Sequence, residues 1–232
     1  MIQVAYTNSN CSDLWEIFQK QTLKHCKLPL YLIADKEPKN FGISGLNIYN
    51  NKEPYYKVWI DSLNKFNSDY FIYLQEDFFL YSDVNEDKLN EYLKFLKKNT
   101  EYSFVRLIKS GALNNKKITN NLYEIESTNK DVFSMQSTIW RTKDYIKLLD
   151  KVKDDKWLEN EKYVKASIEL NIKGLYHYDN EPKRGMAHYD SNVYPYIATA
   201  LVRGKWNLSE YKNELGFILK ENNIIFEKRG KY

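Results

Sequence analysis

The sequence predicts an α/β protein with a central, mainly parallel sheet and flanking helices. Segments with strand character alternate with amphipathic helical segments along most of the chain, which is the pattern of strand–helix–strand units. One segment, residues 70–74, is continuously apolar and aromatic, as expected of a strand that helices cover on both faces. The 232 residues are enough for one sizeable core, so we expect a single domain over residues 1–232.

The first half of the chain opens with an apolar stretch, residues 2–6, that predicts a short buried strand. Asp13 and Glu16 then have the spacing of a capping box, which predicts that a helix begins there. Pro54 suits the first turn of a later helix, whose apolar residues recur at helical spacing. The remaining predictions are strands at residues 30–34, near 48 and at 70–74, and a helix over 85–98.

The second half continues the alternation. Gly174 is expected to close a helix, since glycine commonly ends helices. Residues 114–121 and 181–191 have the polar, aperiodic composition of loops. The predicted strands are residues 104–108, 133–140 and 175–178, and the predicted helices are 145–152, 157–171 and a terminal one through Leu208 and Leu219.

Composition excludes several classes of protein. The 35 Lys and Arg exceed the 31 Asp and Glu by only 4 charges, too few for a nucleic-acid binder recognised by charge alone. P-loop and G-x-G-x-x-G motifs are absent, which argues against P-loop NTPases and standard dinucleotide dehydrogenases. With no apolar run of membrane length and no secretory signal, we expect a cytoplasmic protein without a transmembrane segment. Cys11 and Cys26 have no metal-type spacing and are expected to be free thiols.

Acidic residues follow the apolar strand at residues 70–74. Such a strand delivers Glu76 and Asp77 to the carboxyl edge of the sheet, where ligands of open α/β folds bind. Beside apolar neighbours, two adjacent charges cost several kcal/mol unless they are paired, hydrogen-bonded or bound to a cation. A Mg²⁺–diphosphate site is one interpretation, because Mg²⁺ prefers carboxylate oxygens and shares its coordination with phosphates. Solvated carboxylates in a strand-to-loop transition are the other.

The segment 69–79 resembles the acidic-motif segment of the GT-A-fold glycosyltransferases, a Rossmann-like family. In that family an apolar strand leads into an Asp-x-Asp-type motif, which holds a divalent metal against the diphosphate of the donor. Asp77 matches the last acid, Glu76 takes the middle position, and Gln75 departs from the motif at the first. The resemblance implies a GT-A fold, a nucleotide-sugar donor beside Gln75 and Glu76, and Mn²⁺ or Mg²⁺ at Asp77.

A second segment, from Trp157 to Glu161, resembles the Trp-x-x-Glu-like region where inverting members place a catalytic carboxylate. An inverting transfer needs a base beside the acceptor hydroxyl. Glu161 is preferred to Glu159, because it lies one helical turn after Trp157 and on the same face, where Trp157 can contact the acceptor sugar. Both glutamates would equally suit the positive amino end of a helix.

Metal and nucleotide contacts are also implied by position in the family. A late His contributes a further metal ligand in many members, which makes His188 a candidate; an ordinary surface histidine is the alternative. Thr7, Asn8 and Ser9 follow the opening strand, where the family holds base and ribose, although a solvated turn has the same composition.

Three basic residues are candidates for phosphate contacts. Lys57 lies on the helix before the acidic segment, where a solvated lysine is the ordinary alternative. Arg203 and Lys205 lie in a basic-aromatic segment, and residues 203–232 are expected to form a closing segment and helix over the donor. The alternative is a connecting turn with Trp206 packed in the core.

The leading hypothesis is therefore a glycosyltransferase that moves a sugar, with inversion, from a nucleoside-diphosphate donor to a glycan or other hydroxyl acceptor. A non-catalytic sugar- or nucleotide-binding protein on the same fold is the first alternative. A structural or partner-binding α/β domain is the second. No nucleic-acid partner is expected.

Overall fold

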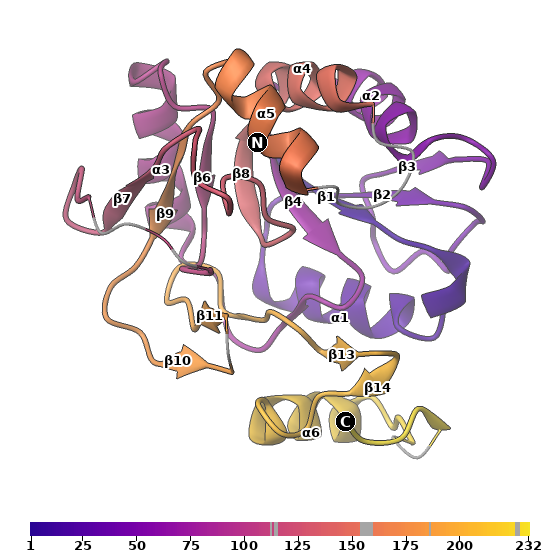
Figure 1. Ribbon diagram of the computed structural model, residues 1–232. Coiled ribbons are helices and arrows are strands. Elements are labelled where there is room, and N and C mark those ends of the chain that lie inside the picture. Colours follow the sequence, from indigo (N-terminus) through magenta and orange to yellow (C-terminus); the bar gives the residue numbers. More distant parts are fainter. Residues whose placement is uncertain (112, 114–115, 154–159, 186, 226–227) are drawn as a thin grey trace.

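The computed structural model describes residues 1–232 except 112, 114–115, 154–159, 186 and 226–227. Its centre is an eight-stranded sheet between two layers of helices (Figure 1). In chain order the strands are β1 (Ile2–Tyr6), β2 (Leu30–Ala34), β3 (Gly45–Ile48), β4 (Tyr70–Gln75), β6 (Phe104–Arg106), β7 (Leu122–Ile125), β8 (Thr138–Arg141) and β9 (Gly174–His177).

The order across the sheet is β3-β2-β1-β4-β8-β6-β9-β7. Strands β3, β2, β1 and β4 run parallel, and β8 enters antiparallel between β4 and β6. Strand β9 is parallel to β6, and β7 closes the far edge antiparallel to β9. The predicted α/β class and mainly parallel sheet are confirmed, and the order β3-β2-β1-β4 follows the Rossmann order 3-2-1-4.

Helices form where apolar side chains recur every three or four residues. The helices are α1 (Trp15–His25), α2 (Tyr55–Phe66), α3 (Glu86–Lys98), α4 (Thr142–Val152), α5 (Asn160–Glu169) and α6 (Lys212–Glu221), with a 3-10 turn η1 (Ser9–Cys11). Trp59 of α2, Tyr145 of α4 and Tyr163 of α5 pack in one core on one face of the sheet. Phe18 of α1 and Tyr92 of α3 pack in the core on the other face.

Short strand pairs and α6 lie beyond the carboxyl ends of the parallel strands (Figure 1). They are β5 (Phe79–Leu80) with β12 (Tyr196–Ile197), β10 (Lys183–Arg184) with β11 (His188–Tyr189), and β13 (Leu201–Val202) with β14 (Lys205–Trp206). Trp206 is 1% exposed and packs in the core with α1 and α6. The hairpin that carries Arg203 is thus fastened to the core through a buried tryptophan.

The predicted capping box is wrong. Helix α1 begins at Trp15, and its N-cap, Leu14, makes no side-chain capping bond. The carboxylate of Asp13 instead accepts hydrogen bonds from Arg229, and Glu16 pairs with Lys20. The η1 turn before the helix moves its start beyond the position that the capping spacing indicated.

Several boundaries also differ from the predictions. Of the strand predicted at 133–140, only the end forms a strand, as part of β8. The chain before Thr138 lies outside the ladder, and Met135 and Gln136 line a cavity. Strand β7 falls next to the predicted loop and was not expected, since its four residues are too few for a clear alternation. The prediction of free thiols is confirmed for Cys11 and Cys26. In the described part of the chain, no helix is both long and apolar enough to cross a membrane.

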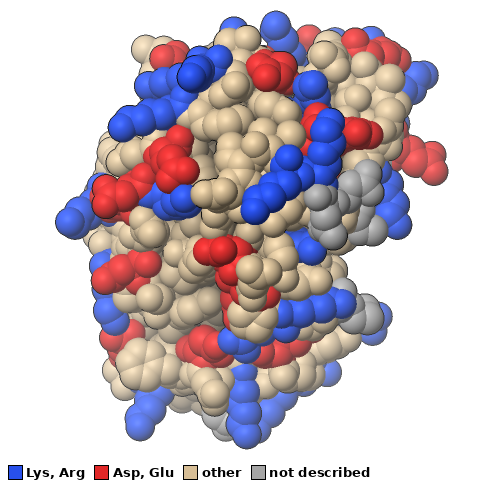
Figure 2. Space-filling model, turned by 90° about the vertical axis from the view of Figure 1, so that its left-hand side faces the viewer, with Lys and Arg blue, Asp and Glu red and all other residues tan. Residues whose placement is uncertain are grey.

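Charged side chains of both signs alternate over the face that carries α3 and β7 (Figure 2). On this face no single sign gathers into a stripe. The even distribution agrees with the small net charge of +4.

Candidate active site

The candidate site lies where the strand order reverses. From β1 the chain passes to β2 on one side, and β4 pairs with β1 on the other, with Tyr6 opposite Gln75. The loops after β1 and β4 therefore leave the same edge of the sheet next to each other. Ligands of open α/β sheets bind outside the carboxyl ends of the strands at such a reversal.

A cavity of about 580 Å³ opens at this edge. We call it the β4 cavity. Its lining comes from the end of β4, the two residues before Ser137, η1 and the N-cap of α1, and the β13–β14 hairpin with the two residues 198 and 199 before it. The lining residues are Cys11, Leu14, Gln75, Glu76, Asp77, Phe78, Met135, Gln136, Ala198, Thr199, Leu201, Arg203 and Gly204.

Glu76 and Asp77 are half-buried carboxyl groups in the wall of the β4 cavity. Burial, together with the charge of Asp77, raises the pKa of Glu76 to about 7, although Cys11 and Arg229 act in the opposite direction. Burial also raises the pKa of Asp77 to about 6, against a hydrogen bond from the Leu201 amide. Among the described residues, neither carboxylate forms an ion pair. A cation in the cavity would relieve this unfavourable pairing of like charges.

The loop after β1 is held by Asp35, which the sequence analysis did not single out. The backbone N–H of Ser9 donates to Asp35 over 2.8 Å and its hydroxyl over 2.6 Å, and Asn51 donates over 3.0 Å. These hydrogen bonds outweigh burial and hold the pKa of Asp35 below its usual value. The signal was present in the sequence, because Asp35 follows the apolar strand β2 as Glu76 follows β4.

The other predicted nucleotide contacts are already engaged within the protein. Thr7 is 1% exposed, and its hydroxyl donates to the Ile33 carbonyl over 3.0 Å. Asn8 accepts from the Asn10 amide and donates to the Tyr49 hydroxyl over 3.2 Å. The loop therefore offers a supporting framework at the strand ends, with Ser9 and Asn8 at its half-buried surface.

The predicted basic residues lie in different places. Arg203 is exposed in the β13–β14 turn and lines the β4 cavity, with a φ of 51°. Lys205 is exposed one residue after Gly204, which also lines the cavity. Lys57 is exposed on α2, where it pairs with Asp61 and lies 3.9 Å from Glu53. Of these side chains, only Arg203 borders the acid pair's cavity.

His188 lies apart from the β4 cavity. It is 6% exposed, stacks on Tyr211 with ring centroids 5.9 Å apart, and its Nε2 lies 3.7 Å from Glu210. Burial lowers the pKa of His188, which favours the neutral ring. Within the described ranges, no group of three or more His, Cys, Asp and Glu side chains is arranged to hold a metal ion.

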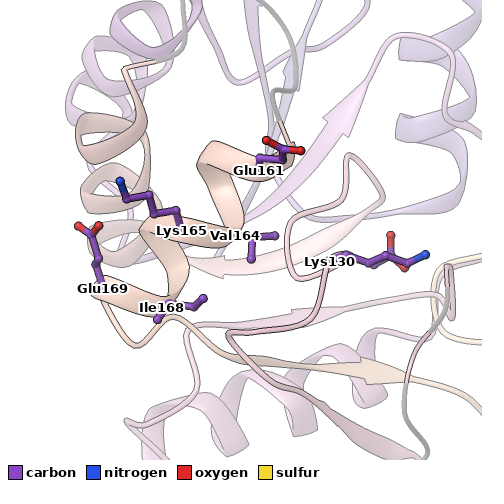
Figure 3. Close-up of a pocket in the computed structure, with 7 residues that line it drawn as sticks. Lys130, Glu161, Val164, Lys165, Ile168 and Glu169 are labelled. Atoms are coloured by element: carbon purple, nitrogen blue, oxygen red, sulfur yellow. The ribbon is translucent and has the colours of Figure 1, made fainter.

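Glu161 borders a second hollow, of about 720 Å³, which we call the α5 groove. Figure 3 shows Val164 and Ile168 pointing from α5 towards the segment with Lys130, and Glu161 at the start of the helix. The other lining residues are Asp131, Lys165 and Glu169. Two further predicted residues, Trp157 and Glu159, lie outside the described residues.

One short segment contributes to the lining of both hollows. Residues 130 and 131 line the α5 groove, and residues 135 and 136, a few positions later, line the β4 cavity. Arg106 of β6 holds this segment, since its guanidinium donates a hydrogen bond to the Asp131 carbonyl over 2.7 Å. The ring of Phe133 stacks on the ring of Tyr163 of α5, with the ring centroids 4.0 Å apart. Neighbouring parts of one segment thus line the two hollows, and that segment is anchored to the sheet and to α5.

Comparisons with known proteins give a distant likeness of fold. No family model and no curated protein matches the sequence. CMP:2-keto-3-deoxy-manno-octonic acid synthetase, solved with CTP, is 9% identical over 76% of this chain and 89% of its own, with a TM-score of 0.47. A cytidylyltransferase from Leptospira borgpetersenii is 13% identical over 100% of this chain and 98% of its own, also with a TM-score of 0.47. The case for a function rests on the residues of this chain.

Proposed function

We propose that the protein is a glycosyltransferase that binds a nucleoside-diphosphate sugar in the β4 cavity and transfers the sugar to a hydroxyl acceptor. One observation carries the proposal: Glu76 and Asp77 stand side by side in the cavity wall with raised pKa values and no ion-pair partner among the described residues. Their place at the strand reversal is where an α/β sheet binds its ligand.

The acid pair fits a divalent cation that is shared with a diphosphate. Mg²⁺ and similar hard cations bind one or two carboxylates and complete their coordination with substrate phosphates and water. Glu76 and Asp77 would hold such a cation, Mn²⁺ or Mg²⁺, which would supply positive charge to the diphosphate. Arg203, which also lines the cavity, would add positive charge where the leaving group develops negative charge.

The α5 groove offers a place for the acceptor. It shares the 130–136 segment with the β4 cavity, so an acceptor there would lie beside the donor. In the proposed reaction Glu161 takes the proton of the acceptor hydroxyl while its oxygen bonds to the anomeric carbon. The bond from that carbon to the diphosphate oxygen breaks, and the electron pair leaves with the nucleoside diphosphate.

A thermal-shift screen tests the proposal most economically. Ligands that bind the native state raise the melting temperature, so UDP- and GDP-linked sugars are compared with and without Mn²⁺. We expect one class to stabilise the wild type, and Asp77→Asn to lose that shift. Glu124→Gln is the matched control, because Glu124 is a buried carboxylate paired with Lys116 away from the cavity.

Product analysis separates transfer from binding alone. The stabilising donor is incubated with glycan acceptors, and release of the nucleoside diphosphate is measured together with the new glycoside. Binding without release or transfer would contradict an enzyme and favour a sugar- or nucleotide-binding protein. If no nucleotide sugar stabilises the chain, the proposal fails.

A further inference from the structure

Two glutamines line the β4 cavity: Gln75 ends β4, and Gln136 lies two residues before β8. In the β4–β8 ladder, Tyr73 is opposite Thr138. The paired register ends there, with Gln75 two residues after Tyr73 and Gln136 two residues before Thr138. Gln75, at the end of β4, lies on the face of Tyr73.

The carboxamide of Gln75 is oriented by its neighbours. Its Nε2 donates to the Tyr73 hydroxyl over 2.9 Å and lies 3.9 Å from the sulfur of Met135. Two acceptors therefore surround the nitrogen, as an NH₂ group requires. In the described part of the chain Oε1 has no hydrogen-bond partner. Gln75 consequently offers the cavity an acceptor.

Gln136 is oriented in the opposite sense. The Tyr196 hydroxyl accepts a hydrogen bond from the Ser137 amide over 3.1 Å. The hydroxyl proton is therefore available for Gln136, and Tyr196 donates it to Oε1 of Gln136 over 2.6 Å. Tyr196 is 2% exposed, and burial raises its pKa well above the usual value, so the proton stays in place. The oxygen of Gln136 is thus occupied. Its NH₂ group, which has no partner among the described residues, offers the cavity donors.

We propose that Gln136 and Gln75 form a paired subsite for neighbouring hydroxyl groups of the transferred sugar, in which Gln136 donates and Gln75 accepts. The inference rests on the proposed function. A sugar hydroxyl can both donate and accept, so two adjacent hydroxyls match the two amides. Both amides are neutral, whereas the nearby Glu76 and Asp77 are acidic. The subsite therefore selects a neutral sugar over one that carries a carboxylate.

The test separates binding of the sugar from binding of the nucleotide. Dissociation constants are measured by calorimetry for UDP-glucose and GDP-mannose, and for UDP and GDP as their sugar-free counterparts. Gln136→Ala removes the donor, and Gln136→Glu keeps an oxygen for Tyr196 but replaces the NH₂ group. We expect Gln136→Ala to raise the dissociation constant of the sugar-bearing probe about 3- to 10-fold, which is the effect of one neutral hydrogen bond. The dissociation constant of the sugar-free probe should stay unchanged.

Tyr196→Phe tests the orientation, and the chain offers a closely matched control. Tyr194, two residues earlier, is 0% exposed and donates to the Oε1 of Gln3 over the same 2.6 Å. Gln3 is not among the described residues that line the β4 cavity. Tyr196→Phe should raise the dissociation constant of the sugar-bearing probe about 3-fold or more. Tyr194→Phe should leave the ratio of the dissociation constants of the sugar-bearing and sugar-free probes unchanged.

The outcomes distinguish failure of the inference from failure of the proposed function. If the Gln136 variants bind both probes like the wild type, or weaken both equally, the hydroxyl subsite is wrong although the nucleotide site stands. Tighter binding of UDP-glucuronate than of UDP-glucose would also contradict the neutral subsite. If the wild type binds neither sugar-bearing nor sugar-free nucleotides, the proposed function fails, and the inference fails with it.

Discussion

Arg229 donates two hydrogen bonds to the carboxylate of Asp13 and so joins the carboxyl-terminal segment to the start of α1. Its guanidinium also lies over the ring of Trp206, 5.9 Å from the centroid, and donates to the Gly204 carbonyl over 3.3 Å. Gly204 belongs to the wall of the β4 cavity. The Arg229–Asp13 pair thus links the β13–β14 turn to the segment before α1, and both contribute lining residues to the cavity.

The first prediction concerns this fastening. Arg229→Ala should weaken nucleotide-sugar binding several-fold, because the β13–β14 turn loses its link to α1. The loss of stability should stay near 1 kcal/mol, since Asp13 is 57% exposed and a solvated ion pair contributes little. Calorimetry and urea unfolding measure the two effects. Lys228→Ala is the control, and equal donor affinity in both variants would contradict the proposed fastening.

The second prediction concerns Asp35. Asp35→Ala removes the acceptor of the two Ser9 bonds and the Asn51 bond, and should lower the free energy of unfolding by about 2 kcal/mol. Asn51→Ala breaks one of the three and should cost less. Urea unfolding of the two variants gives the comparison. Equal effects, or none from Asp35→Ala, would show that Asp35 does not hold the loop after β1.

The third prediction concerns pH. The raised pKa values of Glu76 and Asp77, about 7 and about 6, mean that the folded protein binds protons that the unfolded chain has lost. Their contribution to stability is therefore full at low pH and is lost as pH rises through 6 to 7. Glu76→Gln mimics the protonated form. Its free energy of unfolding, relative to that of the wild type, should therefore rise by on the order of 2–3 kcal/mol from about pH 5 to about pH 8.

Urea unfolding at the two pH values measures this difference. Glu16→Gln is the control, because the hydrogen bond from Lys20 lowers the pKa of Glu16 and Lys20 keeps its charge over this range. That group stays ionised across the range, so its variant should show a constant difference from the wild type. A constant difference for Glu76→Gln as well would mean that Glu76 is already ionised at pH 5.

The fourth prediction concerns the proposed base. Glu161→Gln should bind the donor like the wild type and lower turnover by about 10²–10⁴-fold, the usual range for a positioned acid or base. Initial rates of nucleoside diphosphate release with acceptor present measure this. Glu169→Gln, on the same groove but paired with Lys151, is the control. An active Glu161→Gln with an inactive Glu159→Gln would move the role by two residues.

The sequence predicted the parts of the fold whose signals are local. Strands β1, β2 and β4 are continuous apolar runs, and α2 and α3 carry regular apolar spacing, so their positions follow from pattern alone. The same reasoning placed Glu76 and Asp77 at the carboxyl edge of the sheet. It also had the means to find Asp35, which follows β2 in the same way.

Contacts between distant parts of the chain were beyond such reasoning. Gln136 and Tyr196 are 60 positions apart, and Asp13 and Arg229 are 216 apart. No periodicity relates such pairs, because tertiary packing alone brings them together. The capping box failed for this reason: the carboxylate of Asp13 has a partner from the far end of the sequence. The insertion of β8 between β4 and β6 is likewise a matter of packing.

The central claim is that Asp77, with Glu76, holds a nucleotide sugar through a divalent cation. Calorimetric titration of the stabilising donor, in Mn²⁺ and in chelator, into the wild type and Asp77→Asn tests it most directly. We expect the wild type to bind at least about 10-fold tighter in Mn²⁺, which corresponds to about 1.4 kcal/mol, and Asp77→Asn to lose this difference. Equal affinity of the wild type in Mn²⁺ and in chelator would contradict the claim.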